Sequence, residues 1–226
     1  MSVAARLAEV RSMIASACAR AGRDVAEVTL VAVSKTHDAA LVREAYAAGQ
    51  RDFGENYVQE LTAKRDALAD LDGLRWHFIG HLQTNKARAI APFVATVHTV
   101  DSPRLASELD RRVAAAGRVV DVFVQVNVGG ESQKSGCAPA ELPAVLDALA
   151  GCASLRLRGL MTVPPHTDDP AGAAPYFAAL RALRDANGGA ARMPDLSMGM
   201  THDLDVAVAQ GATVVRVGTA IFGARG

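Results

Sequence analysis

Eight short runs rich in apolar and β-branched residues alternate with helical stretches along this sequence, and that alternation constrains the fold more than any other feature. Parallel neighbouring strands need a crossover connection, which is usually a helix, so the pattern predicts a parallel sheet. Eight such units in about 200 residues predict an α/β fold with a closed (β/α)8 (TIM) barrel. The predicted strands span 28–35, 51–54, 75–80, 96–100, 119–128, 155–163, 195–198 and 213–217.

The predicted helices have recognisable ends. An extra N-terminal helix over 3–21 places apolar side chains at helical spacing and stops at Gly22, before the first strand. Asp38 and Ser102 are candidate caps at the start of two later helices. Beyond the N-terminal helix, the predicted helical stretches cover 38–49, 55–70, 84–91, 102–117, 138–150, 171–186 and 203–210.

A doubly wound dinucleotide-binding sheet is the main alternative to the barrel. It needs a G-x-G-x-x-G pattern after an early strand. The first predicted strand is followed instead by Ser34-Lys35-Thr36-His37, so this alternative is disfavoured. Because the sequence contains no repeat, linker or low-complexity run that would mark a boundary, we expect a single domain over residues 1–226.

Composition and charge exclude several classes of partner. Lysine plus arginine equals aspartate plus glutamate at 24 each, so there is no basic field to hold nucleic acid or an anionic membrane. Without a signal-peptide core or an apolar segment of membrane-spanning length, the sequence predicts a soluble, cytoplasmic protein. We expect a monomer, with its three cysteines present as reduced thiols.

Lys35 ends the first apolar run, at the edge of the sheet where α/β proteins collect ligands. A desolvated lysine at that position can lose its proton and form a Schiff base with a carbonyl compound. The alternative is a lysine that extends to solvent from a strand end.

A second group of residues predicts a phosphate site. Gly218 and Thr219 follow the last strand and precede a short apolar stretch that could begin a helix, which would offer backbone N–H groups to an anion. After the seventh strand, Ser197 and Gly199 are placed to supply the other half of the site. A tight glycine loop is the alternative interpretation.

A carbonyl-reactive lysine opposite a phosphate site describes a pocket for pyridoxal 5'-phosphate, whose aldehyde and phosphate lie on opposite sides of one ring. Arg216, embedded among valines, needs a partner, and a ligand could supply one. An arginine against the ring nitrogen would leave that nitrogen unprotonated, because a guanidinium only donates. The ring would then be a poor electron sink.

Other polar residues are more ambiguous. His77 and His81 stand four apart in a strand-like segment, where they would not share a helical face, so no metal site is expected. Asn56 could contact the cofactor or cap the following helix. The loop 131–136 could be a lid over the site or a solvated loop.

Several motifs together resemble the pyridoxal phosphate homeostasis proteins. They are Leu30-Val31-Ala32-Val33-Ser34-Lys35, the segments 53–60 and 76–83, Leu196-Ser197-Met198-Gly199-Met200 and Val215-Arg216-Val217-Gly218-Thr219-Ala220-Ile221-Phe222-Gly223. The resemblance runs through nearly the whole sequence. It implies a single-domain barrel, similar to the N-terminal domain of alanine racemase, that binds pyridoxal phosphate on Lys35.

The resemblance also implies roles for individual residues. Ser197, Gly218 and Thr219 fall on phosphate-contact positions, and Arg216 falls on the ring-nitrogen position. Two features depart from the family. His202 stands where members commonly carry an acidic residue, and the sequence stops at Gly226 where many members continue with a tyrosine and basic residues.

Three functions compete at this stage. The first is a protein that carries or buffers pyridoxal phosphate, maintains vitamin B6 balance without established turnover, and passes the cofactor to apo-forms of enzymes that use it. The second is a pyridoxal-phosphate-dependent enzyme such as an amino-acid racemase, and the third is a Schiff-base aldolase. Fold alone does not decide among them. A racemase needs a second acid/base group above the cofactor, so we favour the carrier.

Overall fold

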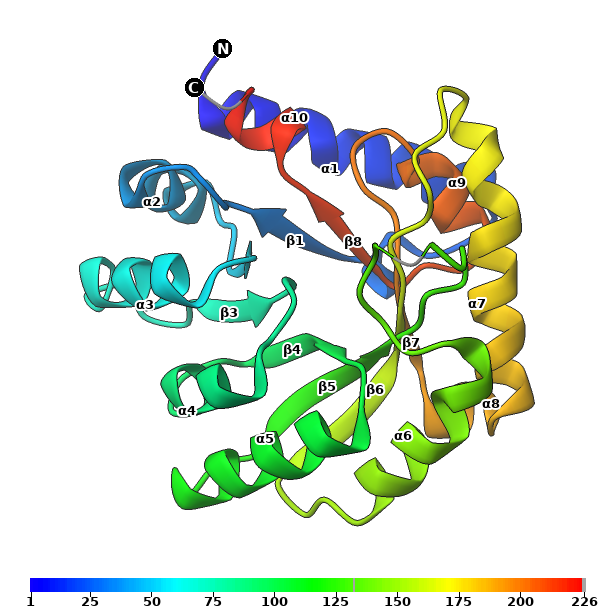
Figure 1. Cartoon of the computed structure of the whole chain (residues 1–226). Coiled ribbons are helices and arrows are strands. Elements are labelled where there is room, and N and C mark those ends of the chain that lie inside the picture. Colours follow the sequence, from blue (N-terminus) through cyan, green and yellow to red (C-terminus); the bar gives the residue numbers. More distant parts are fainter. Residues whose placement is uncertain (132, 225–226) are drawn as a thin grey trace.

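Eight parallel strands close into a barrel in chain order, as the alternating sequence pattern predicts (Figure 1). The computed structural model describes residues 1–131 and 133–224. Each strand pairs with the next along the chain, and β8 pairs with β1 to complete the closure. The strands are β1 (Thr29–Val33), β2 (Asp52–Glu55), β3 (Arg75–Phe78), β4 (Thr96–Val100), β5 (Val120–Gln125), β6 (Leu155–Met161), β7 (Asp195–Ser197) and β8 (Val214–Val217).

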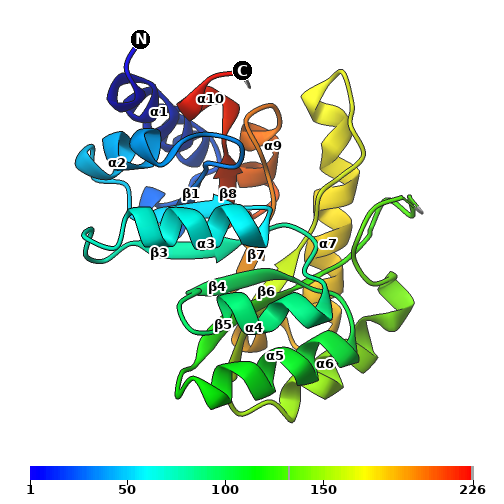
Figure 2. The ribbon, with the colours of Figure 1, turned by 60° about the vertical axis from the view of Figure 1, so that its left-hand side comes forward.

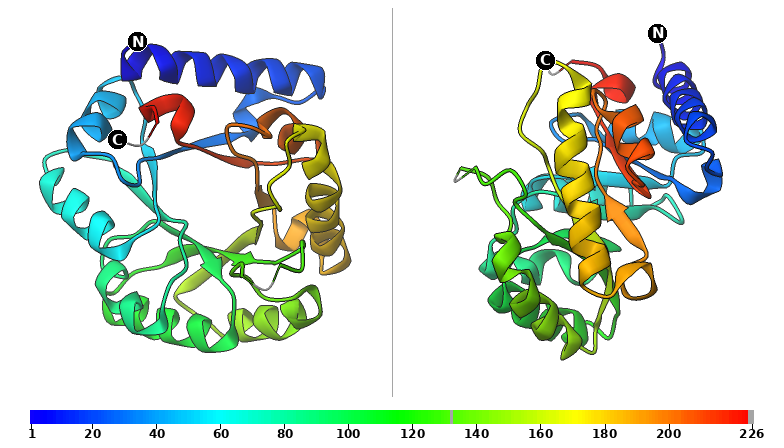
Figure 3. Two further views of the ribbon diagram at one scale, coloured as in Figure 1. Left: turned by 45° about the horizontal axis from the view of Figure 1, so that its top comes forward. Right: turned by 90° about the vertical axis from the view of Figure 1, so that its right-hand side faces the viewer.

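Helices surround the strands on the outside of the barrel (Figures 2 and 3). Short 3-10 turns precede several of them: η1 (Val25–Glu27), η2 (Thr84–Lys86), η3 (Pro139–Glu141) and η4 (Pro170–Ala173). The α-helices are α1 (Val3–Arg20), α2 (Ala39–Ala47), α3 (Val58–Ala67), α4 (Ala87–Ile90), α5 (Pro103–Ala115), α6 (Leu142–Ala150), α7 (Ala174–Ala186), α8 (Gly189–Arg192), α9 (Leu204–Ala209) and α10 (Thr219–Phe222).

The N-terminal helix α1 packs over the seam where the barrel closes. Ser2 caps it by accepting a hydrogen bond from the Ala5 N–H group over 3.2 Å. Its buried stripe contacts α9, α10 and α2, the helices that follow strands β7, β8 and β1. Helix α1 therefore lies along the outside of the barrel next to the β1–β8 pair, with its apolar face toward α9 and α10 (Figure 3).

Polar side chains are concentrated inside the barrel. The main apolar core lies between the strands and the helices, as expected for parallel strands that are buried on both faces. A smaller apolar cluster of Val31, Phe123, Met161 and Val214 lies apart from it. Beside this cluster are buried polar residues from five strands: Asp52, His77, His98, Ser197 and Arg216.

The structure corrects some predicted boundaries. Glu55, expected at the start of a helix, is the last residue of β2, and its side chain is buried. Asp38 occupies the N-cap position of α2 but makes no capping hydrogen bond, whereas the Ser102 hydroxyl accepts from the Leu105 N–H group over 3.3 Å. The short helix α8 was not predicted, because its glycine- and alanine-rich sequence has too few apolar side chains to show a period.

Within the described residues, no helix is both long enough and apolar enough to cross a bilayer. Cys18, Cys137 and Cys152 are free thiols, and burial raises the pKa of Cys137 to about 12. Cys18 and Cys137 are buried, whereas Cys152 is half-buried.

Candidate functional site

Lys35 lies in a tight turn at the carboxyl end of β1, two residues beyond the last strand residue. Its side chain is half-buried. The next residue, Thr36, has a φ of 64°, which places a β-branched residue in the left-handed region. That conformation is strained for threonine, and strain of this kind persists only where the surroundings hold it.

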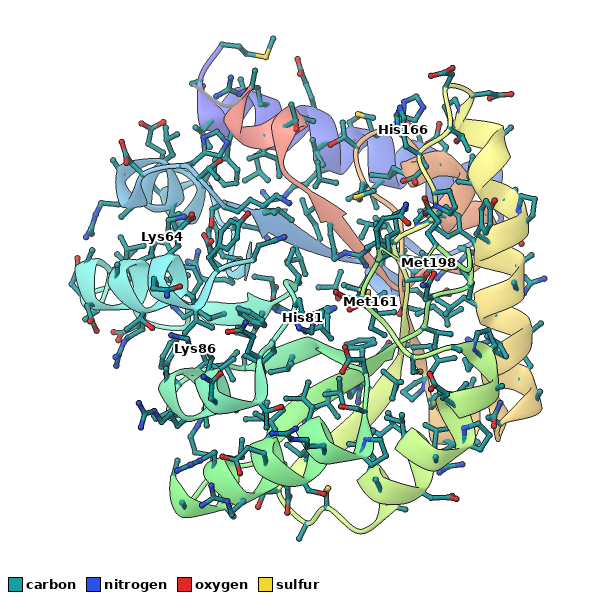
Figure 4. All side chains as sticks on the ribbon, viewed as in Figure 1. Lys64, His81, Lys86, Met161, His166 and Met198 are labelled. Atoms are coloured by element: carbon teal, nitrogen blue, oxygen red, sulfur yellow. The ribbon has the colours of Figure 1, made fainter. Side chains whose placement is uncertain are left out.

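A buried ion pair holds the turn on its upstream side. Lys64 of α3 donates to Glu55 Oε1 over 2.6 Å and to the Ser34 carbonyl over 2.7 Å, and the Ser34 hydroxyl donates to the same Glu55 oxygen over 2.6 Å. Burial raises the pKa of Glu55, and the bonds from Lys64 and Ser34 oppose that rise. The Lys64 side chain lies between α2 and α3 (Figure 4), and no local sequence pattern indicates this role.

The turn is held on its downstream side by the same helix. The Thr36 N–H group donates to Glu60 Oε2 over 2.8 Å, and Glu60 in turn lies 3.4 Å from Lys64 Nζ. Two residues of α3 at helical spacing therefore fix the backbone on both sides of Lys35. The spacing of Glu60 and Lys64 can be read from the sequence, but their contacts with the Lys35 turn are seen only in the structure.

The last strand brings Gly218 and Thr219 beside this turn. Ala32 of β1 pairs with Val217 of β8, so Gly218 lies beside the last residue of β1. A Cβ added to Gly218 would lie 3.0 Å from the Val33 carbonyl oxygen, so glycine relieves a close approach here.

Thr219 is exposed and begins the short helix α10. The N–H groups of Ile221 and Phe222 donate to the Gly218 carbonyl over 2.8 and 2.9 Å. The N–H groups that precede them in the first turn have no intrahelical acceptor. The end of β8 therefore offers backbone donors and one hydroxyl at the position predicted for a phosphate.

Ser197 and Gly199 have structural roles of their own. The Ser197 side chain is fully buried, and its hydroxyl bonds to Arg216 and His98 inside the barrel. Gly199 has a φ of 95°, and a Cβ there would lie 2.4 Å from the Cβ of Ala207. Close packing against α9 thus accounts for the glycine, and the phosphate contacts of both residues stay a prediction.

Arg216 is buried in the barrel with 4% of its surface exposed. Its Nη1 donates to Ser197 Oγ over 2.7 Å and its Nη2 to the Thr162 carbonyl over 2.9 Å. Both acceptors are uncharged. Burial lowers the pKa of Arg216 to about 10, against an opposing effect of Asp203. The partners expected from the sequence are therefore found, but neither of these bonds neutralises the guanidinium charge.

Asn56 does not cap α3. Tyr57 occupies the N-cap position, so the capping alternative is wrong. Among the described residues, the buried Asn56 Oδ1 atom has no hydrogen-bond partner. Its backbone lies against Gly80, where an added Cβ would sit 2.0 Å from the Asn56 carbonyl oxygen. An unpartnered buried amide oxygen at the mouth of the barrel is an atom that a ligand could satisfy.

The histidines separate into two environments. His77 lies inside the barrel, with Asp52 and Arg75 beside a cavity of about 430 Å³ at the amino ends of the strands. His81 is exposed and 3.7 Å from Asp101, and Figure 4 shows it on the loop after β3. The part of the chain that is described contains no cluster of metal-ligand residues.

The loop after β5 is tied at its base. Asn127 Nδ2 donates to the Glu131 carbonyl over 2.8 Å, and Lys134 Nζ donates to the Pro164 carbonyl over 2.8 Å. Ser132 lies outside the described residues, as do Arg225 and Gly226 at the end of the chain. The Lys134 bond joins this loop to the loop after β6.

His202 is exposed beside His166, with 6.2 Å between the ring centroids. Neither ring belongs to the buried group around Arg216. The adjacent Asp203 is buried, and its carboxylate accepts from the Met200 N–H group over 2.6 Å.

Comparison with known proteins decides the family. The model of the alanine racemase N-terminal domain matches residues 6–226. The pyridoxal phosphate homeostasis protein of Pseudomonas aeruginosa is 51% identical over 99% of this chain and 96% of its own length. That of Escherichia coli is 44% identical over 99% and 97%. The chain belongs to the pyridoxal phosphate homeostasis protein family.

Solved structures share the fold of this member of the pyridoxal phosphate homeostasis protein family. PipY of Synechococcus elongatus with PLP bound is 41% identical, with a TM-score of 0.85 over 98% of this chain and all of that one. Alanine racemase from Streptomyces coelicolor is 22% identical, with a TM-score of 0.69 over 96% of this chain and 58% of that one. The second match shows a shared fold alone, and the TIM barrel predicted from the sequence is confirmed.

Proposed function

We propose that this protein binds pyridoxal 5'-phosphate at the carboxyl end of the barrel, with Lys35 as the attachment residue. The observation that carries the proposal is the β1–β8 pairing, which places the Lys35 turn beside Gly218 and Thr219 although they are far apart in sequence. The cofactor supplies an aldehyde that reacts with amines. Relatives named for pyridoxal phosphate homeostasis, and a PLP-bound neighbour at 41% identity, support this choice of ligand.

The residues at the mouth fit this group on three counts. Asn56 Oδ1 is buried and lacks a partner. The exposed Thr219 hydroxyl and the start of α10 offer donors to a phosphate. Arg216 is a buried donor whose two bonded acceptors are neutral, so the acceptor nitrogen of the ring suits it.

The same geometry favours a carrier over an enzyme. A guanidinium has no acceptor atom and donates without giving up its proton, so the ring nitrogen facing Arg216 would stay unprotonated. The relatives at 51% and 44% identity are named as homeostasis proteins. We therefore propose that the protein buffers pyridoxal phosphate and passes it to apo-forms of other enzymes, with little turnover of its own.

Borohydride trapping tests the attachment. The purified protein is loaded with pyridoxal phosphate, reduced and digested, and the pyridoxyl label is mapped by mass spectrometry. We expect it on Lys35. The buried Lys64 and the loop residue Lys134 serve as internal controls, because both are engaged in hydrogen bonds elsewhere. Predominant label on either would refute the assignment.

A transfer assay tests the carrier role. Loaded protein is mixed with an apo-enzyme that needs the cofactor, and recovery of that enzyme's activity is followed. Recovery is expected without measurable racemisation of alanine by the loaded protein alone. Amino-acid turnover at about 1 per second or faster, lost in Lys35→Ala, would favour a racemase-like enzyme instead.

A further inference from the structure

A continuous line of hydrogen bonds crosses the interior of the barrel and ends at Arg216. His77 Nε2 bonds to Asp52 Oδ1 over 2.9 Å, and His77 Nδ1 bonds to His98 Nε2 over 2.9 Å. His98 Nδ1 then bonds to Ser197 Oγ over 2.8 Å, and Arg216 Nη1 donates to the same oxygen over 2.7 Å. All five residues are buried, with exposures between 0% and 8%.

The two ends of this chain carry opposite charges. Burial alone would raise the pKa of Asp52, but hydrogen bonds from His77 and Arg75 outweigh it and lower the pKa to about 2. Asp52 is therefore a carboxylate at neutral pH, while Arg216 remains a cation. The four bonds between them connect an anion near the amino ends of the strands to a cation near the mouth.

These charges fix the direction of every bond when both imidazoles are neutral. A carboxylate only accepts, so His77 Nε2 carries a hydrogen and His77 Nδ1 accepts. His98 must then donate from Nε2 and accept at Nδ1. That leaves the Ser197 hydroxyl as the donor to His98, with its lone pair facing Arg216. Each bond holds one hydrogen, and all of them point toward Asp52.

The ring of His98 is also fixed in place. It stacks on Phe123 with a centroid distance of 4.6 Å and an interplanar angle of 13°. Burial lowers the pKa of His98 well below its usual value, and the nearby Arg216 cation adds to the effect. A neutral, immobile ring is suited to accept one hydrogen bond from Ser197 and to hold that hydroxyl in one orientation.

We propose that His98, supported by His77, is a positioning residue that keeps Ser197 as a hydrogen-bond acceptor and so holds the Arg216 guanidinium in place for the ring nitrogen of the cofactor. This rests on the proposed function, because it takes Arg216 as the ring-nitrogen contact. Without the acceptor at His98 Nδ1, the Ser197 hydroxyl would lose its buried partner and could rotate its hydrogen toward Arg216. The guanidinium would then be repelled from its present position.

Nitrogen NMR of the ligand-free protein tests the chain without the cofactor. Protein labelled with 15N-histidine should show His98 at neutral pH as a neutral ring with its hydrogen on Nε2, and should show a hydrogen on His77 Nε2. Ser197→Ala should change the His98 Nδ1 resonance, because its donor is removed. A hydrogen on His98 Nδ1 in the wild-type protein would overturn the assignment.

A ligand comparison tests whether His98 acts through the ring nitrogen. We compare pyridoxal phosphate with its carbocyclic analogue, in which a C–H group replaces that nitrogen. His98→Phe should weaken binding of pyridoxal phosphate about tenfold, as expected for a hydrogen bond to a charged group, and leave the analogue nearly unaffected. Equal loss for both ligands, or no loss for either, would overturn the proposal.

Two variants guard against a trivial loss of folding. His98→Asn keeps an acceptor near the Nδ1 position and should retain most of the pyridoxal phosphate affinity, even if His98→Phe is too unstable to purify. Thr99→Val, on the same strand, removes a buried hydrogen bond to the Gly80 carbonyl that lies outside the chain. It should affect both ligands alike. If the wild-type protein binds neither ligand, the proposed function fails while the tautomer measurement still stands.

Discussion

Glu60 accepts a hydrogen bond from the backbone N–H group of Thr36 over 2.8 Å, and this contact holds the residue after Lys35 in the left-handed region. A threonine in that region costs about 1–2 kcal/mol relative to an ordinary backbone conformation. The strained turn thus costs stability but places Lys35 at the mouth of the barrel, and Glu60 of α3 holds the turn in this conformation.

We expect Glu60→Ala to loosen this turn. The exposed Thr36 N–H group can bond to water, so the loss in free energy of unfolding should be modest, about 1 kcal/mol. Cofactor retention should fall more clearly, because Lys35 no longer has one fixed position. Urea unfolding and dialysis of loaded protein measure the two effects. Glu44→Ala, an exposed glutamate of α2, is the control and should change neither.

The buried pair of Lys64 and Glu55 predicts a large effect of a single substitution. Lys64→Met would leave the Glu55 carboxylate without its cation and should lower the free energy of unfolding by about 3 kcal/mol. Adding Glu55→Gln should recover much of that loss, since it removes the uncompensated charge. Denaturant unfolding of both variants checks this. Lys86→Met on η2 serves as the matched control, and a loss there as large as for Lys64 would contradict the explanation.

The barrel could be predicted well because the patterns that indicate its strands and helices are local in the sequence. Each strand and helix leaves its own period in a short window, and eight such units leave few alternatives to closure. The errors occur where a distant contact decides. The sequence Gly54-Glu55-Asn56 resembles the start of a helix. In the structure Glu55 instead ends β2, where its buried carboxylate pairs with Lys64.

The site could be predicted only in part for the same reason. Lys35 and Arg216 could be proposed for the site because a cation within an apolar run is costly wherever it folds. His98 was missed because a lone histidine in Thr96-Val97-His98-Thr99-Val100 has no partner within reach along the sequence. Its two partners come from β3 and β7, and only the strand register brings them together.

The start of α10 predicts selectivity for the phosphate group. Thr219→Val removes an exposed hydroxyl donor at the mouth and should weaken retention of pyridoxal phosphate about tenfold, because hydrogen bonds to charged groups are among the stronger ones. Pyridoxal, which lacks the phosphate, should bind almost as before. Absorbance titrations of both ligands measure this, and a parallel loss for pyridoxal would place the phosphate elsewhere.

Acid stability should depend on the pair formed by Asp52 and His77. The folded-state pKa of Asp52 is lowered to about 2 from 3.8, so its stabilising contribution is present above about pH 4 and is lost as the pH falls from there toward 2. At 1.36 kcal/mol per pKa unit the contribution is about 2 kcal/mol. Asp52→Asn should therefore lower stability at neutral pH and flatten its decline below pH 4.

The buried His98 adds a decline at higher pH. Its folded-state pKa is lowered, so the unfolded chain takes up a proton first and stability falls as the pH drops below about 6.5. Asp52→Asn should leave this upper part of the curve in place, whereas His98→Asn should flatten it and keep the decline below pH 4. Urea unfolding midpoints measured from pH 7.5 to 3 separate the two windows. A single decline that both variants alter equally would mean that the two groups titrate as one unit.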